Sequence, residues 1–143
     1  DTCFESKSFE YVFFSYFGLD YLLPKTERIK ALREVFSLLK PGGIFVFSTH
    51  NSLQPLVPLS VRNLKFVAKD IFDLYLRSKN RSRIGSRYKF ESVPLGEIEI
   101  YISNPVHQWI QLRKCGYTPI DILGEREDCL RFFERDPHYV AKK

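Results

Sequence analysis

A helix, a sharp turn and a buried strand follow one another between Glu27 and Asn51, and no other stretch constrains the fold as strongly. Pro41 cannot continue a helix, and the two glycines after it let the backbone reverse through positive φ. Ile44 to Phe47 is apolar without alternation, which is typical of a strand covered on both faces in a parallel sheet. The helix is indicated by apolar residues at helical spacing: Ile29, Leu32, Val35, Phe36 and Leu39. Charged residues expected on its solvent side are Arg28, Lys30, Arg33 and Glu34.

Two turns rich in small and polar residues mark the predicted binding edge. A second apolar strand, Phe9 to Tyr16, precedes the helix, so the order strand, helix, strand predicts a βαβ unit with a right-handed crossover. The first turn is Ser15 to Gly18, and the second is Ser48 to Asn51. In an open α/β sheet, ligands bind at the carboxyl ends of the strands, where both turns lie.

Two segments of the chain resemble the second half of class I S-adenosylmethionine-dependent methyltransferases. The first runs S-F-E-Y-V-F-F-S from Ser8, followed by R-x-x-A-L-R-E-V-x-x-x-L-K-P-G-G-x-x-V-F-S from Arg28. The second is Tyr101 to Gly124, which is similar to the family's next helix and strand. The resemblance implies an α/β, Rossmann-like fold, the C-terminal half of the methyltransferase domain, with an inserted helix and strand. It also implies S-adenosylmethionine as cofactor and methyl transfer to an unidentified, small-molecule acceptor.

The resemblance implies roles for individual residues at the binding edge. Cofactor contacts are expected from Ser15, Tyr16 and Phe17, although both aromatics could also be core residues, and from Thr2, near the family's adenine-binding loop. His50 is a candidate catalytic base, because its ordinary pKa allows proton transfer at neutral pH. It could instead line the substrate pocket or only hydrogen-bond its loop. Asn51 and Tyr101 are candidate substrate contacts.

The cofactor motif of the family has no counterpart in this sequence. None of the seven glycines forms a G-x-G-x-x-G cluster. The chain has no Met, and Asp1 stands eight residues before a central strand. We therefore expect a fragment that binds cofactor poorly by itself and leaves its first strand as a bare apolar edge.

Basic residues concentrate in the middle of the chain. Nine lysines and arginines and two aspartates between Ser60 and Phe90 give a charge of +7, against +5 for the whole chain. We divide the chain into a βαβ unit (1–51), an inserted basic, lid-like segment (52–95) and C-terminal strands and helix (96–143). The segment is expected to contain a helix over Val61 to Leu76 and a loop over Ser78 to Tyr88. Gly96 to Ser103 alternates as a half-exposed strand, either in an added hairpin or in the lid.

Two other functions are compatible with these patterns. A non-catalytic module could bind nucleic acid or an acidic partner through the basic segment, although a solvated face or a lid is the more usual meaning of such a run. Another nucleotide-binding enzyme, such as a dehydrogenase, would need a G-x-G-x-x-G turn, and the L-K-P-G-G turn argues against it.

Length and composition narrow the class of protein. At 143 residues, with 44% hydrophobic and 15% aromatic residues, the chain predicts one globular domain. No apolar run is long enough to span a membrane, and no signal peptide opens the chain. Three scattered cysteines form no zinc-binding set, so no metal site is expected, and a reducing, cytoplasmic setting is the simplest interpretation. The oligomeric state stays open.

Overall fold

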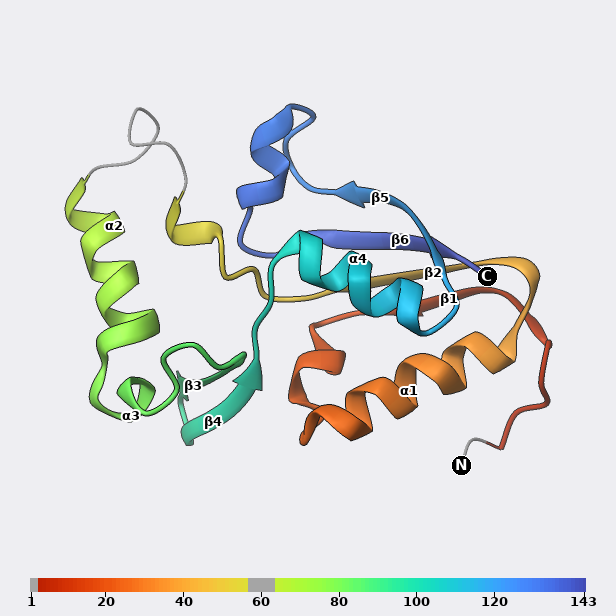
Figure 1. The fold of residues 1–143 in the computed structure, drawn as a ribbon, viewed down its shortest axis with the longest axis horizontal. Coiled ribbons are helices and arrows are strands. Elements are labelled where there is room, and N and C mark those ends of the chain that lie inside the picture. Colours follow the sequence, from red (N-terminus) through yellow and green to blue (C-terminus); the bar gives the residue numbers. More distant parts are fainter. Residues whose placement is uncertain (1–2, 57–63) are drawn as a thin grey trace.

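The centre of the molecule is a four-stranded sheet in the order β1-β2-β6-β5 (Figure 1). The computed structural model describes residues 3–56 and 64–143. The strands are β1 (Phe9–Phe14), β2 (Leu39–Ser48), β5 (Thr118–Leu123) and β6 (His138–Lys142). β1 and β2 are parallel, whereas β6 runs antiparallel between β2 and β5. The α/β, Rossmann-like prediction is therefore confirmed, and the last strand of the chain, β6, lies inside the described sheet.

Two helices, α1 (Lys25–Leu38) and α4 (Pro105–Lys114), pack on one face of this sheet. The predicted stripe of α1 is confirmed at Leu32 and Val35, which pack with Leu112 of α4. The sheet contributes Phe45, Phe47, Tyr139, Ala141 and Ile122 to the same core. Asn104 caps α4 by accepting a hydrogen bond from the backbone N–H of His107 (2.8 Å). This packing fixes the direction in which β2 leaves the core.

The opposite face of the sheet is not covered in the same way. Tyr11 and Phe13 of β1 are 74% and 62% exposed, and Ile44 and Val46 of β2 are only partly buried. The expectation that β2 is covered on both faces is thus wrong for the described residues, because α1 and α4 pack on the same side. The free edge of β1 matches the expected bare edge, since β1 pairs only with β2 among the described strands.

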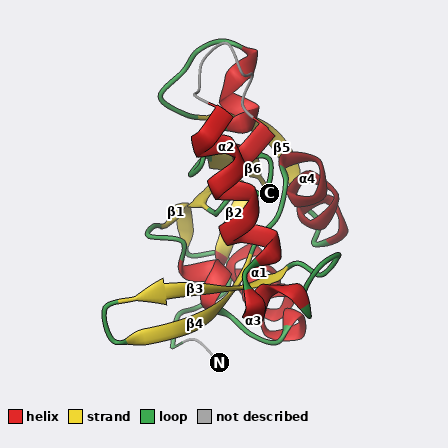
Figure 2. Ribbon diagram, turned by 90° about the vertical axis from the view of Figure 1, so that its left-hand side faces the viewer, coloured by secondary structure: helices red, strands yellow, loops and turns green. Residues whose placement is uncertain are grey.

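The segment between β2 and α4 stands at the carboxyl ends of β1 and β2 (Figures 1 and 2). It contains α2 (Leu64–Ile71), a π-helical turn η3 (Phe72–Leu76), the short α3 (Ser78–Arg81), β3 (Tyr88–Val93) and β4 (Gly96–Tyr101). β3 and β4 form a separate antiparallel hairpin, which confirms the hairpin alternative for Gly96 to Ser103. The expected loop over Ser78 to Tyr88 begins instead with α3. The start of the expected helix, residues 61–63, lies outside the described residues.

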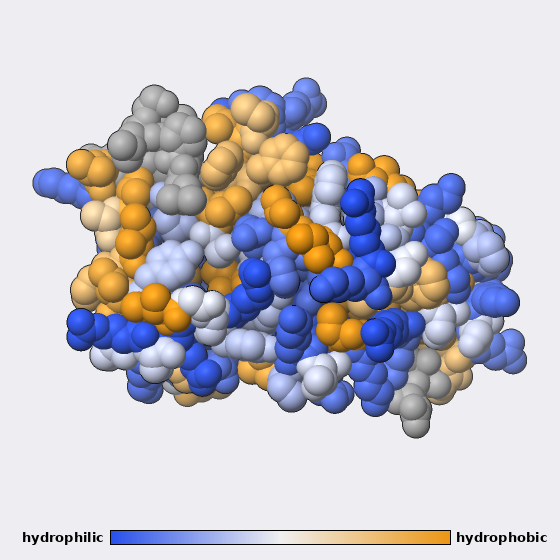
Figure 3. All heavy atoms as spheres, in the orientation of Figure 1, coloured by the Kyte–Doolittle hydropathy of each residue, from blue (hydrophilic) through white to orange (hydrophobic). Residues whose placement is uncertain are grey.

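Short 3-10 turns connect the remaining elements: η1 (Gly18–Tyr21), η2 (Gln54–Leu56) and η4 (Cys129–Phe133). Hydrophobic residues are visible over α2 in the space-filling view (Figure 3), where Leu64 and Phe66 are exposed, and Phe72 of η3 is exposed as well. None of the described helices is both long enough and apolar enough to cross a membrane.

Candidate functional site

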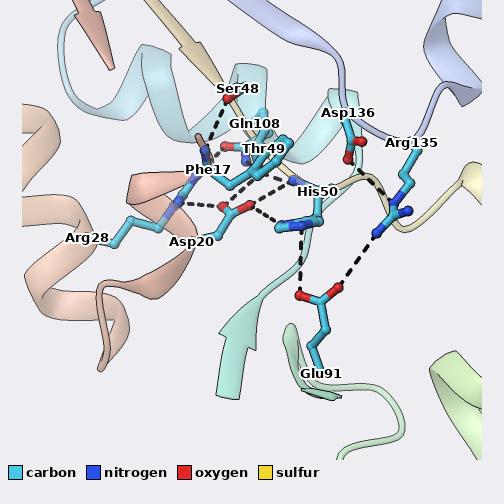
Figure 4. Close-up of polar contacts among 10 residues, drawn as sticks. All are labelled: Phe17, Asp20, Arg28, Ser48, Thr49, His50, Glu91, Gln108, Arg135 and Asp136. Carbon is cyan, nitrogen blue, oxygen red and sulfur yellow. Dashed lines mark hydrogen bonds and ion pairs between the residues drawn. The ribbon is translucent and has the colours of Figure 1, made fainter. Parts of the chain in front are cut away.

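The carboxyl ends of β1 and β2 meet around one buried carboxylate, that of Asp20 in η1. Its Oδ1 accepts hydrogen bonds from Arg28 Nη1 (3.0 Å) and from the Thr49 hydroxyl (2.8 Å). Its Oδ2 accepts one from the backbone N–H of His50 (2.7 Å) and lies 3.0 Å from His50 Nδ1. Figure 4 shows these groups converging on Asp20 from separate elements. Charge-assisted contacts of this kind hold the negative charge at one point between η1, α1 and β2.

Arg28 of α1 is the counter-ion of Asp20 and is itself fully buried. The expectation that Arg28 lies on the solvent side of the helix is therefore wrong. Its Nε donates to Gln111 Oε1 (3.0 Å) and its Nη2 to Gln108 Oε1 (3.2 Å), and both partners lie on α4. Burial lowers the pKa of Arg28, and the charge of Asp20 opposes that shift. One cation thus joins α1, η1 and α4 in the interior.

His50 lies two residues beyond β2, with its ring almost fully buried. A carboxylate only accepts hydrogen bonds, so in the neutral ring Asp20 assigns the proton to Nδ1 and leaves Nε2 as an acceptor. Nε2 is 4.0 Å from Glu91 Oε2 on β3. Desolvation alone would lower the pKa of His50, but the hydrogen bond and charge of Asp20, with the charges of Glu91 and Asp136, raise it above 6.5. The ring is thus oriented for proton transfer near neutral pH.

A cavity of about 330 Å³, here called the His50 cavity, opens between the end of β2 and the segment from α2 to β4. Its walls combine apolar side chains, such as Leu74 and Ile100, with the charged groups of Lys89 and Glu91. This volume is at the lower end of the range of small-molecule sites, about 300–1,000 Å³. A larger hollow of about 560 Å³ runs along α1 from Lys25 to Ser37. It does not include the buried network of Asp20, so the His50 cavity is the candidate site.

The turn after β1 holds three predicted cofactor contacts. Tyr16 and Phe17 both adopt the left-handed backbone conformation (φ 53° and 56°), which is unusual for aromatic residues and recurs at functional sites. The Phe17 N–H donates to Ser48 Oγ (3.2 Å), and its ring centroid lies 4.3 Å from that of His50. Tyr16 is 87% exposed, whereas Ser15 is half-buried. Phe17 therefore supports His50, and Tyr16 faces outward; their contacts with cofactor stay predictions. Thr2 lies outside the described residues.

The two predicted substrate contacts beside His50 are both buried. Asn51 lines the His50 cavity, but its side-chain nitrogen donates to the carbonyls of Phe132 and Glu134 (both 2.8 Å). Its side-chain oxygen accepts from the backbone N–H of Leu53 (2.9 Å). Tyr101 is fully buried, and the centroid of its ring lies 4.5 Å from Arg28 Cζ. It is not among the residues that line the cavity. Asn51 therefore shapes the cavity wall, whereas Tyr101 packs behind it.

Three basic residues of the inserted segment pair with glutamates of β4. Arg83 Nη2 lies 2.9 Å from Glu99 Oε1, and Arg77 Nη2 lies 3.6 Å from Glu97 Oε1. Lys79 also pairs with Glu97. These pairs offset part of the positive charge that would attract a nucleic acid.

Several functional candidates were missed by sequence reasoning, among them Asp20, Glu91 and Lys89. Asp20 stands in a short turn between apolar residues, Leu19 and Tyr21, and that context was the available signal of a buried charge. Gln108 contributes two contacts, because its Nε2 also donates to the Thr49 hydroxyl (3.1 Å). No sequence pattern links a glutamine at position 108 to a threonine at position 49.

The residues of this chain fit only one side of a nucleoside cofactor. The outward Tyr16 and the strained turn of β1 offer a contact surface, whereas the sequence contains no G-x-G-x-x-G turn to hold the methionine portion. Across residues 3–56 and 64–143, no three His, Cys, Asp or Glu side chains are placed to share a metal ion. The site as described is therefore a cavity beside an imidazole that Asp20 orients.

Comparison with known proteins identifies the fold. The sequence matches no protein-family model and no curated protein. The structure resembles a SAM-dependent methyltransferase from Methanosarcina mazei, with a TM-score of 0.68 and 17% identity, covering 100% of this chain and 63% of that one. A putative S-adenosylmethionine-dependent methyltransferase from Listeria monocytogenes gives 0.61 and 16%, covering 100% and 65%.

A third similar structure contains ligands. It is the 1,6-didemethyltoxoflavin-N1-methyltransferase of Burkholderia thailandensis, with bound 1,6-didemethyltoxoflavin and S-adenosylhomocysteine. Its TM-score is 0.54 at 14% identity, covering 96% of this chain and 45% of that one. The chain thus spans less than two thirds of the length of these proteins. The arrangement of β1, α1, β2, α4, β5 and β6 is accordingly that of class I S-adenosylmethionine-dependent methyltransferases, and this chain has the fold of the C-terminal part of their domain.

Proposed function

We propose that the intact protein transfers a methyl group from S-adenosylmethionine to a small-molecule acceptor bound in the His50 cavity. One observation carries the proposal. The imidazole of His50 is oriented by Asp20, and its Nε2 lies at a cavity of suitable size beside the carboxyl end of β2. The Burkholderia structure with bound 1,6-didemethyltoxoflavin supports an acceptor of this kind.

His50 acts as the general base in this proposal. Asp20 keeps the proton of the neutral ring on Nδ1, so Nε2 accepts the proton that the acceptor's hydroxyl or amine loses when its lone pair forms the new bond to carbon. When bound, the cofactor supplies an electrophilic methyl group on a sulfonium centre, which leaves as a neutral thioether. Asp20 and Glu91 stabilise the imidazolium that His50 becomes. The remaining acceleration comes from alignment of the two reactants in the cavity.

Other side chains have supporting roles in the proposal. Ser15, Tyr16 and Phe17 contact the cofactor from the β1 side, and Thr2 is a further proposed contact. Asn51 holds residues 132–134 against the end of β2. Tyr101 positions Arg28, which in turn fixes Asp20. A mobile-lid role for the inserted segment is not required, because its hairpin already closes one side of the cavity.

Calorimetric titration of S-adenosylhomocysteine tests the cofactor half of the proposal. The titration is made with this chain and with a longer protein that includes any residues encoded upstream of Asp1. We expect binding to the longer protein and weaker or absent binding to this chain. Binding to neither protein would leave the fold intact and remove the cofactor assignment.

His50→Gln tests the general-base role, with His107→Gln as the matched loss of an imidazole elsewhere. S-adenosylhomocysteine formation is measured with a panel of small hydroxyl and amine acceptors. We expect His50→Gln to lower kcat by about 10²–10⁴ with little change in KM, and His107→Gln to leave kcat near the wild-type value. A His50→Gln protein with unchanged kcat and raised KM would show that His50 only lines the cavity.

A further inference from the structure

Lys89 is a buried cation for which the proposed mechanism gives no role. It lies on β3 opposite Ile100 of β4 and is 2% exposed. Its ammonium group lies 4.5 Å from the centroid of the Tyr75 ring and donates one hydrogen bond, to the carbonyl of Arg83 (3.4 Å). Burial lowers the pKa of this lysine. A lysine ammonium has three N–H donors, so two of them have no hydrogen-bond acceptor in the described residues.

The neighbouring basic residues differ from Lys89 in one respect. Arg77, Lys79 and Arg83 each pair with a glutamate of β4. Among the described residues, no carboxylate oxygen lies within 4.0 Å of Lys89 Nζ. An ammonium removed from water without a counter-ion is costly, and a ring face with one long hydrogen bond offsets that cost only in part. An anion bound at this point would supply the missing charge.

Lys89 also lines the His50 cavity, together with apolar side chains of Leu74, Ile100 and Ile102. The same cavity therefore contains a proton-accepting group, an apolar wall and a cation that pairs with no carboxylate of the described residues, although Asp70, Asp73 and Glu91 also line the cavity. A ligand that fits all three has an apolar body, a hydroxyl or amine near His50 and an anionic group at Lys89.

We propose that Lys89 binds an anionic oxygen group, a carboxylate or a phosphate, of the acceptor and so selects acidic small molecules as substrates. That the anion belongs to a methyl acceptor rests on the proposed function, whereas the anion site itself is inferred from the contacts of Lys89 alone. The anionic group is a second point of attachment and not the atom that is methylated. It holds the acceptor in one orientation while its hydroxyl or amine meets His50.

Calorimetric titration with benzoate and with inorganic phosphate tests the anion site. Lys89→Met removes the charge and keeps an unbranched apolar side chain, and Lys79→Met is the matched control at an exposed, paired lysine. We expect Lys89→Met to weaken anion binding about tenfold or more, and Lys79→Met to leave it near wild type. Binding of benzoate alone identifies a carboxylate, and binding of phosphate alone identifies a phosphate. Equal anion affinities in wild type and Lys89→Met would overturn the proposal.

Urea denaturation separates an unpaired ligand-binding lysine from a structural one. Removal of an uncompensated buried charge should leave the midpoint urea concentration of Lys89→Met equal to that of wild type or raise it. A large fall in the midpoint would mean that Lys89 has a structural partner, and would contradict the proposal. If Lys89→Met does not fold, NMR of lysine-labelled wild type replaces it. The Lys89 Cε signal should then shift on addition of the anion, and an unmoved Lys89 signal would again exclude the site.

These outcomes are independent of the cofactor test. Anion binding at Lys89 without S-adenosylhomocysteine binding to the longer protein would keep the anion site and remove the methyltransferase proposal. S-adenosylhomocysteine binding, with equal anion affinities in wild type and Lys89→Met, would keep the methyltransferase proposal and remove the anion site.

Discussion

Two groups of ion pairs differ mainly in their surroundings. The interior group joins Asp20, Arg28 and His50, and all three side chains are buried. The surface group joins Arg83 to Glu99 and Arg77 to Glu97 on the hairpin, where each partner remains partly exposed. Water and salt screen the surface pairs, whereas the interior pairs have only protein groups to compensate their charges. Similar ionic contacts therefore fix a reactive group in one region and only neutralise a surface in the other.

The largest difference is expected when one cation is removed from each group. Arg28→Ala should lower the free energy of unfolding by about 3–5 kcal/mol, because it leaves the buried carboxylate of Asp20 without its counter-ion. Arg83→Ala should cost less than about 1 kcal/mol, as is usual for an exposed pair. Urea denaturation followed by the fluorescence of Trp109, the only tryptophan, measures both. Equal losses in the two variants would show that burial does not set the value of these pairs.

The protonation of His50 should give a smaller, pH-dependent difference. Asp20 raises the pKa of His50 above 6.5, so the protonated ring stabilises the folded state. This contribution is complete below pH 6.5 and is lost as the pH rises through the folded-state pKa. The stability advantage of wild type over His50→Gln should therefore shrink above pH 6.5. An advantage that grows with pH over that range would reverse the assigned shift.

His107 provides a control of opposite sign in a separate pH window. Burial, assisted by the positive charge of Arg87, lowers the pKa of His107 to about 4. Its neutral form is thus favoured by folding, and that contribution is present above pH 6.5 and is lost as the pH falls towards 4. Unfolding curves of His107→Gln at several pH values should become more like wild type as the medium is acidified through this window. No such convergence would mean that His107 is equally solvated in both states.

Added salt should reduce the stability contribution of the surface pairs only, and this change should be smaller than the pH effects described above. Glu99→Gln is expected to cost roughly 0.2–1 kcal/mol at low ionic strength and close to nothing in 1 M NaCl. The penalty of Arg28→Ala should persist at both salt concentrations, because solvent ions do not reach the buried pair. Denaturation at the two concentrations measures this contrast. A loss for Arg28→Ala that disappears in salt would place the pair in contact with solvent.

The smallest expected effect is a change in the affinity for nucleic acid. Wild type should bind a short DNA duplex weakly, because Glu97 and Glu99 pair with three of the basic side chains of the inserted segment and offset part of their charge. The double variant Glu97→Gln, Glu99→Gln should bind more tightly and with a steeper dependence on salt. Fluorescence anisotropy at several salt concentrations measures both proteins. Tight, salt-dependent binding by wild type would instead favour the interaction-module alternative.

The amino-acid sequence by itself determined the βαβ unit, the apolar stripe of α1 and the strands that form the sheet. Periodicity and the Pro-Gly-Gly turn report local backbone geometry, and the resemblance placed those elements in a known order. The turn after β2 was also expected at the binding edge, since it follows a parallel strand. These predictions depend on neighbouring residues in the chain, and such residues are close in space in any fold that the sequence adopts.

Only the tertiary structure decided which charges are buried and what they do. Arg28 looked like a solvent-facing helix residue, but Gln108 and Gln111, 80 and 83 positions away, accept its hydrogen bonds inside the core. The same packing buries Asp20 beside Arg28, and Lys89 is removed from solvent because the hairpin places it against Tyr75. Burial of a charge depends on partners brought together by folding, and no local pattern of residues contains that information.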